Sequence, residues 1–193
     1  MFDVETMGVE STAIVLSASI VFFDADTKVE SSPELYWKYV NDACFVKFDA
    51  KEQAKKYNRT VTQSTLDWWK KQAEIPRNLA LKASEEDLSA SEGIEKLRNY
   101  INSNGGSKQL VWARGSLDQV VIDSLCRNLD VESLFMYNMW RDVRTAIDMI
   151  SGYNYCGVKN FKQDHHTIKH DPRHDCALDI MMLVYPQEGT SDE

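Results

Sequence analysis

Short apolar runs mark the first elements of the chain. Residues 2–5 alternate between apolar and acidic side chains, whereas residues 13–23 are almost continuously apolar and rich in β-branched residues. Alternation is typical of a strand with one buried face, and a continuous β-branched run is typical of a buried strand. The pattern predicts strands over 2–5 and 13–23, a turn between them at Gly8–Thr12, and a third strand at 44–48.

Helical spacing begins after residue 60. Within residues 85–102, Ile94, Leu97 and Ile101 recur at intervals of three and four, which predicts an amphipathic helix ending at Asn104–Gly106. The other expected elements are strands at 109–113 and 135–140, and helices that begin with Ser64 as N-cap, with GSLDQ at 115–119 (Ser116 and Gln119 at capping-box spacing), with RDVRT at 141–145 and after Pro172. Strands that alternate with helices indicate an α/β layered fold.

The composition fits one globular domain. The chain has 193 residues, of which 43% are apolar and 27% charged, so a single domain is expected over 1–186, followed by a flexible tail at 187–193. The apolar run at 13–23 is shorter than the roughly 20 residues that a membrane helix needs, and no basic segment precedes it. Four scattered cysteines without a C-x-x-C pair indicate reduced thiols. We therefore expect a cytoplasmic protein with no membrane partner.

The charge balance limits how the chain can meet nucleic acid. Its net charge of −8 argues against a broad basic surface that wraps a polynucleotide. It leaves open an enzyme that engages a few nucleotides, because bound divalent ions supply local positive charge.

Three carboxylates stand at positions that favour a ligand. Asp3 and Glu5 are two residues apart in an expected strand, so their side chains share one face. Such a pair is tolerated if both are solvated or if a cation lies between them. Asp118 lies in the first turn of a helix directly after strand 109–113. An acid there stabilises the helix dipole, and it also lies where ligands gather in α/β sheets.

All four histidines lie within ten residues, and they allow several interpretations. His166, His170 and His174 recur every four residues, which on one helix would form a zinc site, although Pro172 interrupts the run. The cluster with His165 could also be an exposed polar loop. The third interpretation is one catalytic histidine beside a metal-binding carboxylate.

The spacing H-x-x-x-x-D occurs three times in this region. The pairs are His166/Asp171, His170/Asp175 and His174/Asp179, so spacing alone does not choose among them. Asp171 precedes a proline in a loop, and Asp175 is explained as a helix cap. Asp179 lies inside the last apolar helix, where it is held rigidly, as a metal ligand should be. We therefore select His174/Asp179.

Five blocks of sequence resemble the DEDDh 3′-to-5′ exonucleases. They read DVETMG at 3–8, STLDWWKKQ at 64–72, WARGSLDQ at 112–119, RDVRT at 141–145 and HDPRHDCALDIMML at 170–183. The blocks span nearly the whole chain, and the double-Trp segment distinguishes one subgroup from generic proofreading exonucleases. That subgroup holds phage exodeoxyribonucleases and bacterial exoribonucleases, and the phage enzymes are nearer through HDCALDIMM.

The resemblance implies a ribonuclease-H-like fold, a mixed central β-sheet flanked by helices on both sides. It implies a two-metal-ion 3′-5′ exonuclease that releases nucleoside 5′-monophosphates from single-stranded DNA, with an exoribonuclease as the alternative. A non-catalytic zinc- or nucleotide-binding module is a remote alternative. A phage origin would place the protein in the host cytoplasm. By this analogy, His174 is the general base and two Mg²⁺ or Mn²⁺ ions are bound by Asp3, Glu5, Asp118 and Asp179.

The expected substrate contacts lie beside the first strand and in the double-Trp segment. Adjacent helical residues point about 100° apart, so one of Trp68 and Trp69 should be buried and the other should lie at the rim of the site. The residues selected as substrate-binding are Thr6, Met7, Trp69 and Gln72.

Overall fold

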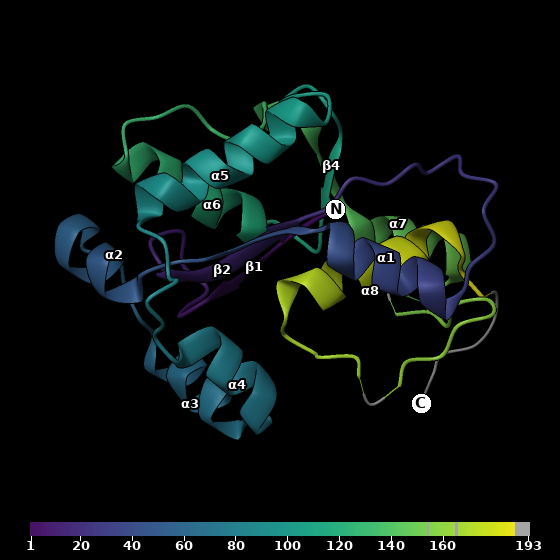
Figure 1. The fold of residues 1–193 in the computed structure, drawn as a ribbon, viewed down its shortest axis with the longest axis horizontal. Coiled ribbons are helices and arrows are strands. Elements are labelled where there is room, and N and C mark those ends of the chain that lie inside the picture. Colours follow the sequence, from purple (N-terminus) through teal and green to yellow (C-terminus); the bar gives the residue numbers. More distant parts are fainter. Residues whose placement is uncertain (154, 165, 188–193) are drawn as a thin grey trace.

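The computed structural model describes residues 1–153, 155–164 and 166–187, as strands and helices in alternation (Figure 1). Five strands and eight α-helices occur in this part of the chain. In order they are β1 Phe2–Thr6, β2 Val15–Ile20, α1 Pro33–Asp42, β3 Cys44–Lys47, α2 Ala50–Tyr57, α3 Gln63–Lys71, α4 Glu74–Leu81, α5 Ala90–Ser103, β4 Val111–Ala113, α6 Leu117–Asn128, β5 Trp140–Asp142, α7 Val143–Ser151 and α8 Pro172–Val184.

The strands form two sheets. β1, β2 and β3 make an antiparallel sheet in that order, and β4 and β5 make a parallel pair. β4 lies in contact with β1, so parallel and antiparallel strands meet at the centre of the molecule. The α/β class is confirmed, but the described residues form two small sheets where one continuous mixed sheet was expected.

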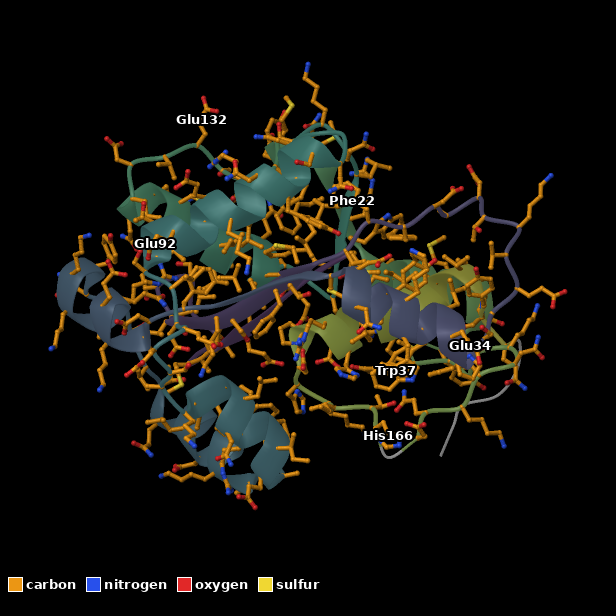
Figure 2. All side chains as sticks on the ribbon, viewed as in Figure 1. Phe22, Glu34, Trp37, Glu92, Glu132 and His166 are labelled. Carbon is orange, nitrogen blue, oxygen red and sulfur yellow. The ribbon has the colours of Figure 1, made fainter. Side chains whose placement is uncertain are left out.

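Helices cover both faces of the three-stranded sheet. α5 and α6 pack on one face, and α8, backed by α1 and α7, packs on the other (Figure 1). The alternation of β1 divides its side chains between the two: Phe2 and Val4 enter the core beneath α5 and α6. Because neighbouring strand residues point to opposite faces, Asp3 and Glu5 face α8. Side chains fill the layer between the strands and both sets of helices (Figure 2).

Most of the expected elements are present. The strands at 2–5, 13–23, 44–48 and 109–113 and the helices after 85, 115, 141 and 172 correspond to β1, β2, β3, β4, α5, α6, α7 and α8. Asp142 is the N-cap of α7 and accepts a hydrogen bond from the Thr145 backbone. Among the described residues, every helix is too short or too polar to cross a lipid bilayer.

Other expectations about local structure were wrong. α3 begins one residue before Ser64, with Thr62 as N-cap. Ser116 is the N-cap of α6, but its side chain makes no capping hydrogen bond. The strand expected at 135–140 is mostly a 3₁₀ turn, and β5 starts only at Trp140. The tail expected at 187–193 lies outside the described residues except for Gln187, whose backbone N–H donates to the Gly157 carbonyl.

Candidate active site

Five carboxylates line one cavity of about 680 Å³ between β1, α6 and α8. They come from three distant parts of the chain, and the fold brings them together because β1 lies against both helices. The negative charges of so many neighbouring carboxylates repel one another unless positive charge compensates them. The carboxylates are Asp3, Glu5, Asp118, Asp175 and Asp179.

The strand acids are held in the cavity by the alternation of β1. Asp3 carries an oxygen, Oδ2, that is buried and has no hydrogen-bond partner among the described residues. Burial raises the pKa of Asp3, and the nearby carboxylate of Asp118 raises it further. Burial also raises the pKa of Glu5. A buried carboxylate oxygen that the chain leaves unsatisfied is the expected mark of an external ligand.

Asp118 is fixed to the sheet by a backbone hydrogen bond. Its Oδ1 accepts from the Val4 N–H at 3.0 Å, and this bond places the first turn of α6 directly over β1. Burial is the main reason that the pKa of Asp118 rises to about 7. The structure thus brings Asp118 to the same cavity as Asp3 and Glu5.

α8 contributes two acids, one helical turn apart. The helix starts at Pro172 with Asp171 as N-cap, whose side chain accepts from the Arg173 backbone. Asp175 is thus inside the helix and lines the cavity, where burial, followed by the charge of Glu5, raises its pKa to about 8. Asp175 was dismissed as a cap, and the structure gives that role to Asp171.

Asp179 differs from the other four acids because a cation holds it. The Arg114 guanidinium donates from Nε at 3.1 Å and from Nη2 at 2.5 Å to its Oδ1. Both side chains are largely buried. The pKa of Asp179 is raised by burial, and Arg114 opposes that rise.

Among the described histidines, His170 is the one that lines the cavity. Its Nδ1 lies 3.6 Å from Oε1 of Glu5, and this neighbour raises its pKa. Its backbone N–H donates to Asp175 Oδ2 at 3.0 Å. The backbone at His170 has φ +63°, a left-handed conformation uncommon outside glycine. Ligand atoms of Glu5, His170 and Asp175 lie within 4.8 Å of one another, a group able to hold a metal ion.

His174 does not lie in the cavity, contrary to the expectation from sequence. It is 4% exposed, its Nδ1 lies 2.7 Å from the Tyr36 hydroxyl, and its ring packs edge-on against Trp37. The reason is helical geometry: a residue next to Asp175 points about 100° away from it. The start signal at Pro172 was enough to find this, because it places positions 175 and 179 on one face and 174 on another.

Among the described residues, His166, His170 and His174 do not form the zinc site considered above. His166 is exposed on the loop before α8 (Figure 2), and His165 lies outside the described residues. Because α8 begins only at Pro172, the four-residue spacing of His166, His170 and His174 does not fall on one helix.

The two tryptophans divide as expected, but in the order opposite to the one selected. Trp69 is fully buried, and its indole N–H donates to the Thr6 carbonyl at 3.0 Å. Trp68 is 40% exposed, lines the cavity, and packs edge-on against His170 with ring centroids 4.7 Å apart. The internal packing of α3 thus uses Trp69 and leaves Trp68 for the rim.

The remaining substrate-binding candidates lie beside the cavity rather than on its lining. The Thr6 hydroxyl donates to the Gly8 carbonyl at 2.6 Å. Met7 packs beside Trp69 in a small apolar cluster. Gln72 donates to the Trp68 carbonyl. Sequence reasoning missed the rim side chains Tyr155, Gln163 and Lys169 as members of this site, which Arg114 and Arg144 also line.

The donor set suits hard divalent cations. Carboxylate oxygens are the ligands that Mg²⁺ and Mn²⁺ prefer, and the buried Asp3 Oδ2, which has no partner among the described residues, is free to coordinate such an ion. The geometry thus defines an acidic site able to hold a metal ion, with a histidine and an exposed aromatic ring at its edge.

The chain belongs to the family described as the 3′-5′ exoribonuclease Rv2179c-like domain, whose model matches residues 1–183. The chain is therefore a member of a 3′-5′ exonuclease family. Among curated proteins, the chain is similar to an exodeoxyribonuclease of Enterobacteria phage T4. The two are 33% identical over 205 aligned positions, which cover 96% of this chain and 87% of the phage enzyme.

Proposed function

We propose that the chain is a metal-dependent exonuclease that removes nucleoside 5′-monophosphates from the 3′ end of single-stranded DNA. One observation carries the proposal: the fold gathers five carboxylates in a single cavity and leaves Asp3 Oδ2 buried without a partner among the described residues. Asp3 and Glu5 on β1, Asp118 on α6 and Asp175 on α8 are the proposed metal ligands.

The ligand set differs from the sequence-based one at a single place. Asp175 replaces Asp179, because Asp179 is already paired with Arg114. When bound, two Mg²⁺ or Mn²⁺ ions supply Lewis-acid stabilisation to the attacking and leaving oxygens of a phosphodiester. Four carboxylates match the charge of two such ions, so the acidic cavity becomes neutral and admits a phosphate.

His170 is the proposed general base. It lies in the cavity with Nδ1 facing Glu5, which favours the tautomer in which Nε2 accepts a proton. Its backbone bond to Asp175 fixes its place relative to a metal ligand. His170 thus accepts the proton of the attacking water, the role first assigned to His174.

The rim supplies the contacts for the substrate strand. Trp68 offers an exposed ring on which a terminal base stacks, as aromatic rings do in proteins that bind single strands. Arg144 and Lys169 line the same cavity and attract the phosphates that precede the 3′ end. The fold that we propose is ribonuclease-H-like with β1 and β4 at its centre, and the contact between these two strands supports it.

The choice of DNA is supported by the similarity of the chain to the phage exodeoxyribonuclease. Degradation of RNA is the second candidate, because the matching family is described by exoribonuclease activity. The experiment compares a DNA and an RNA oligonucleotide of one sequence, each labelled at its 5′ end, with Mg²⁺ and with EDTA. We expect stepwise shortening from the 3′ end of DNA, faster than of RNA, and none in EDTA.

Two results separate the alternatives. Faster shortening of RNA would replace DNA with RNA as the substrate and leave the site intact. Shortening that persists in EDTA, or that survives Asp175→Asn, would overturn the proposed metal site itself. Stoichiometric zinc that remains after dialysis, together with absent nuclease activity, would instead favour the zinc-binding module.

A further inference from the structure

The ion pair between Arg114 and Asp179 joins the two segments that carry acids from opposite sides of the cavity. Arg114 follows β4 directly and precedes the metal-ligand candidate Asp118 by four residues. Asp179 lies one turn of α8 beyond the second candidate, Asp175. The pair therefore bridges the β4–α6 connection and α8 at the level of the site itself.

Several contacts fix the geometry of the Arg114–Asp179 pair. Arg114 Nε donates to both oxygens of Asp179, at 3.1 and 3.2 Å, and Nη2 donates to Oδ1 at 2.5 Å. Both side chains are mostly shielded from water. The Tyr155 ring lies 4.2 Å from the guanidinium carbon and covers its face. Two-point pairing of a planar guanidinium fixes direction as well as distance.

The ion pair between Arg114 and Asp179 opposes the repulsion among the neighbouring acids. Asp3, Glu5, Asp118 and Asp175 face the same cavity, and like charges on β1, α6 and α8 tend to push these elements apart. A buried bridge of opposite charge between α8 and the β4–α6 connection resists that separation.

We propose that Asp179 is a positioning residue, which through Arg114 holds the α8 carboxylate Asp175 at a fixed distance from α6. The proposal rests on the metal site proposed above and deepens it: the spacing of ligands from two elements is set by a cation–anion pair that binds no metal. Partners of this kind, outside the ligand set, change metal affinity about 10- to 100-fold when removed.

The test measures metal binding to the full chain without substrate, by calorimetric titration with Mn²⁺. The variants are Arg114→Gln, Asp179→Asn and the double variant, and Arg144→Gln is the matched control. Arg144 lines the same cavity and carries the same charge, but it belongs to α7.

The sign of the change in Arg114→Gln is the deciding result. Charge alone predicts tighter metal binding when a cation is removed from the cavity, as in Arg144→Gln. Positioning predicts the opposite: Arg114→Gln should lose about tenfold or more in Mn²⁺ affinity. Asp179→Asn should lose the same amount, and the double variant should bind Mn²⁺ no more weakly than either single variant. Arg114→Lys keeps the charge but not the two-point geometry, so it should recover only part of the loss.

Two outcomes would overturn the inference. Affinity in Arg114→Gln equal to or tighter than that of the unmodified chain would show that Arg114 does not position the ligands. Loss of one bound ion in Asp179→Asn but not in Arg114→Gln would make Asp179 a ligand. Thermal melting of each metal-free variant checks folding, and Arg114→Lys serves if Arg114→Gln does not fold. If the unmodified chain binds no metal, or Asp175→Asn binds it fully, the proposed metal site fails instead.

Discussion

Two groups of buried charge lie near opposite ends of α6, and the chain treats them differently. Arg59 is 5% exposed, and burial lowers its pKa to about 10. Its guanidinium donates to three backbone carbonyls and two side-chain oxygens, of Ser11, Ala13, Val121, Ser124 and Asn128. At the other end, Asp118 joins four further acids, and an oxygen of Asp3 has no partner among the described residues.

The difference separates a buried charge with a structural role, Arg59, from the buried carboxylates of the proposed functional site. A buried charge costs free energy unless hydrogen bonds or an opposite charge replace its water. For Arg59, neutral oxygens of the chain supply that replacement, so the residue stabilises the junction of the β1–β2 turn with α6. For the carboxylates the chain supplies less, and the metal ions of the proposed function would supply the rest.

Removing one carboxylate is expected to give the largest effect. Asp175→Asn should lower kcat about 1,000-fold, because a lost metal ligand removes several kcal/mol of transition-state stabilisation. The same variant should melt at a higher temperature than the unmodified chain in EDTA, since one repelling charge is gone. Asp148→Asn, on the exposed face of α7, is the control. A lower melting temperature in EDTA would contradict the contrast drawn with Arg59.

Removing the satisfied charge should act on stability instead. Arg59→Met leaves buried carbonyl oxygens without donors, so the free energy of unfolding should fall by about 3 kcal/mol. Urea denaturation measures this change, and Arg127→Met, at an exposed arginine of α6, should change it little. The folded variant should still bind Mn²⁺. Loss of metal binding in a folded Arg59→Met chain would show that the two groups are not separate.

The two histidines extend the comparison to α8. His170→Asn should lower kcat about 100-fold, the usual contribution of a general base, and asparagine tolerates the left-handed backbone there. His174→Asn should leave kcat nearly unchanged but lower the melting temperature, because it loses the contacts to Tyr36 and Trp37. Measurements are made below the melting temperature of both variants. The reverse pattern would restore His174 as the base.

The smallest effect is expected at the rim. Trp68→Ala should raise KM for a single strand roughly tenfold, because stacking of one base contributes about 1–3 kcal/mol. Trp68→Phe should recover most of the loss, since it keeps a ring. Trp69→Phe is the contrasting variant: it should lower thermal stability through the lost bond to Thr6 and leave KM unchanged. An equal KM in Trp68→Ala and the unmodified chain would remove Trp68 from the substrate site.

Strand alternation carried the sequence-based prediction furthest. The period of two that places Asp3 opposite Phe2 depends on local backbone geometry alone, and the structure follows it. α2 escaped prediction because it is short and polar, and its single buried residue, Gln53, is held by hydrogen bonds to the Val15 backbone. A contact between residues 38 positions apart in the sequence cannot be seen in the local periodicity of apolar and polar residues.

The choice among the histidines depended on where one helix begins. Three pairs share the H-x-x-x-x-D spacing, and a shift of the helix start decides which acid is a cap and which faces the cavity. Apolar context favoured Asp179, but context does not reveal that Arg114 pairs with it. Such pairing depends on tertiary contacts, and the sequence shows only that both residues exist.

The left-handed backbone at His170 bears on how such a site can be transplanted. A histidine and an aspartate grafted at the right interval onto a regular helix would not converge, because the turn aims the ring before the helix begins. The unit that a protein engineer must carry over runs from this turn through the first coils of α8. That unit has to include the Asp171 N-cap and Pro172 at the start of the helix as well as the reacting groups.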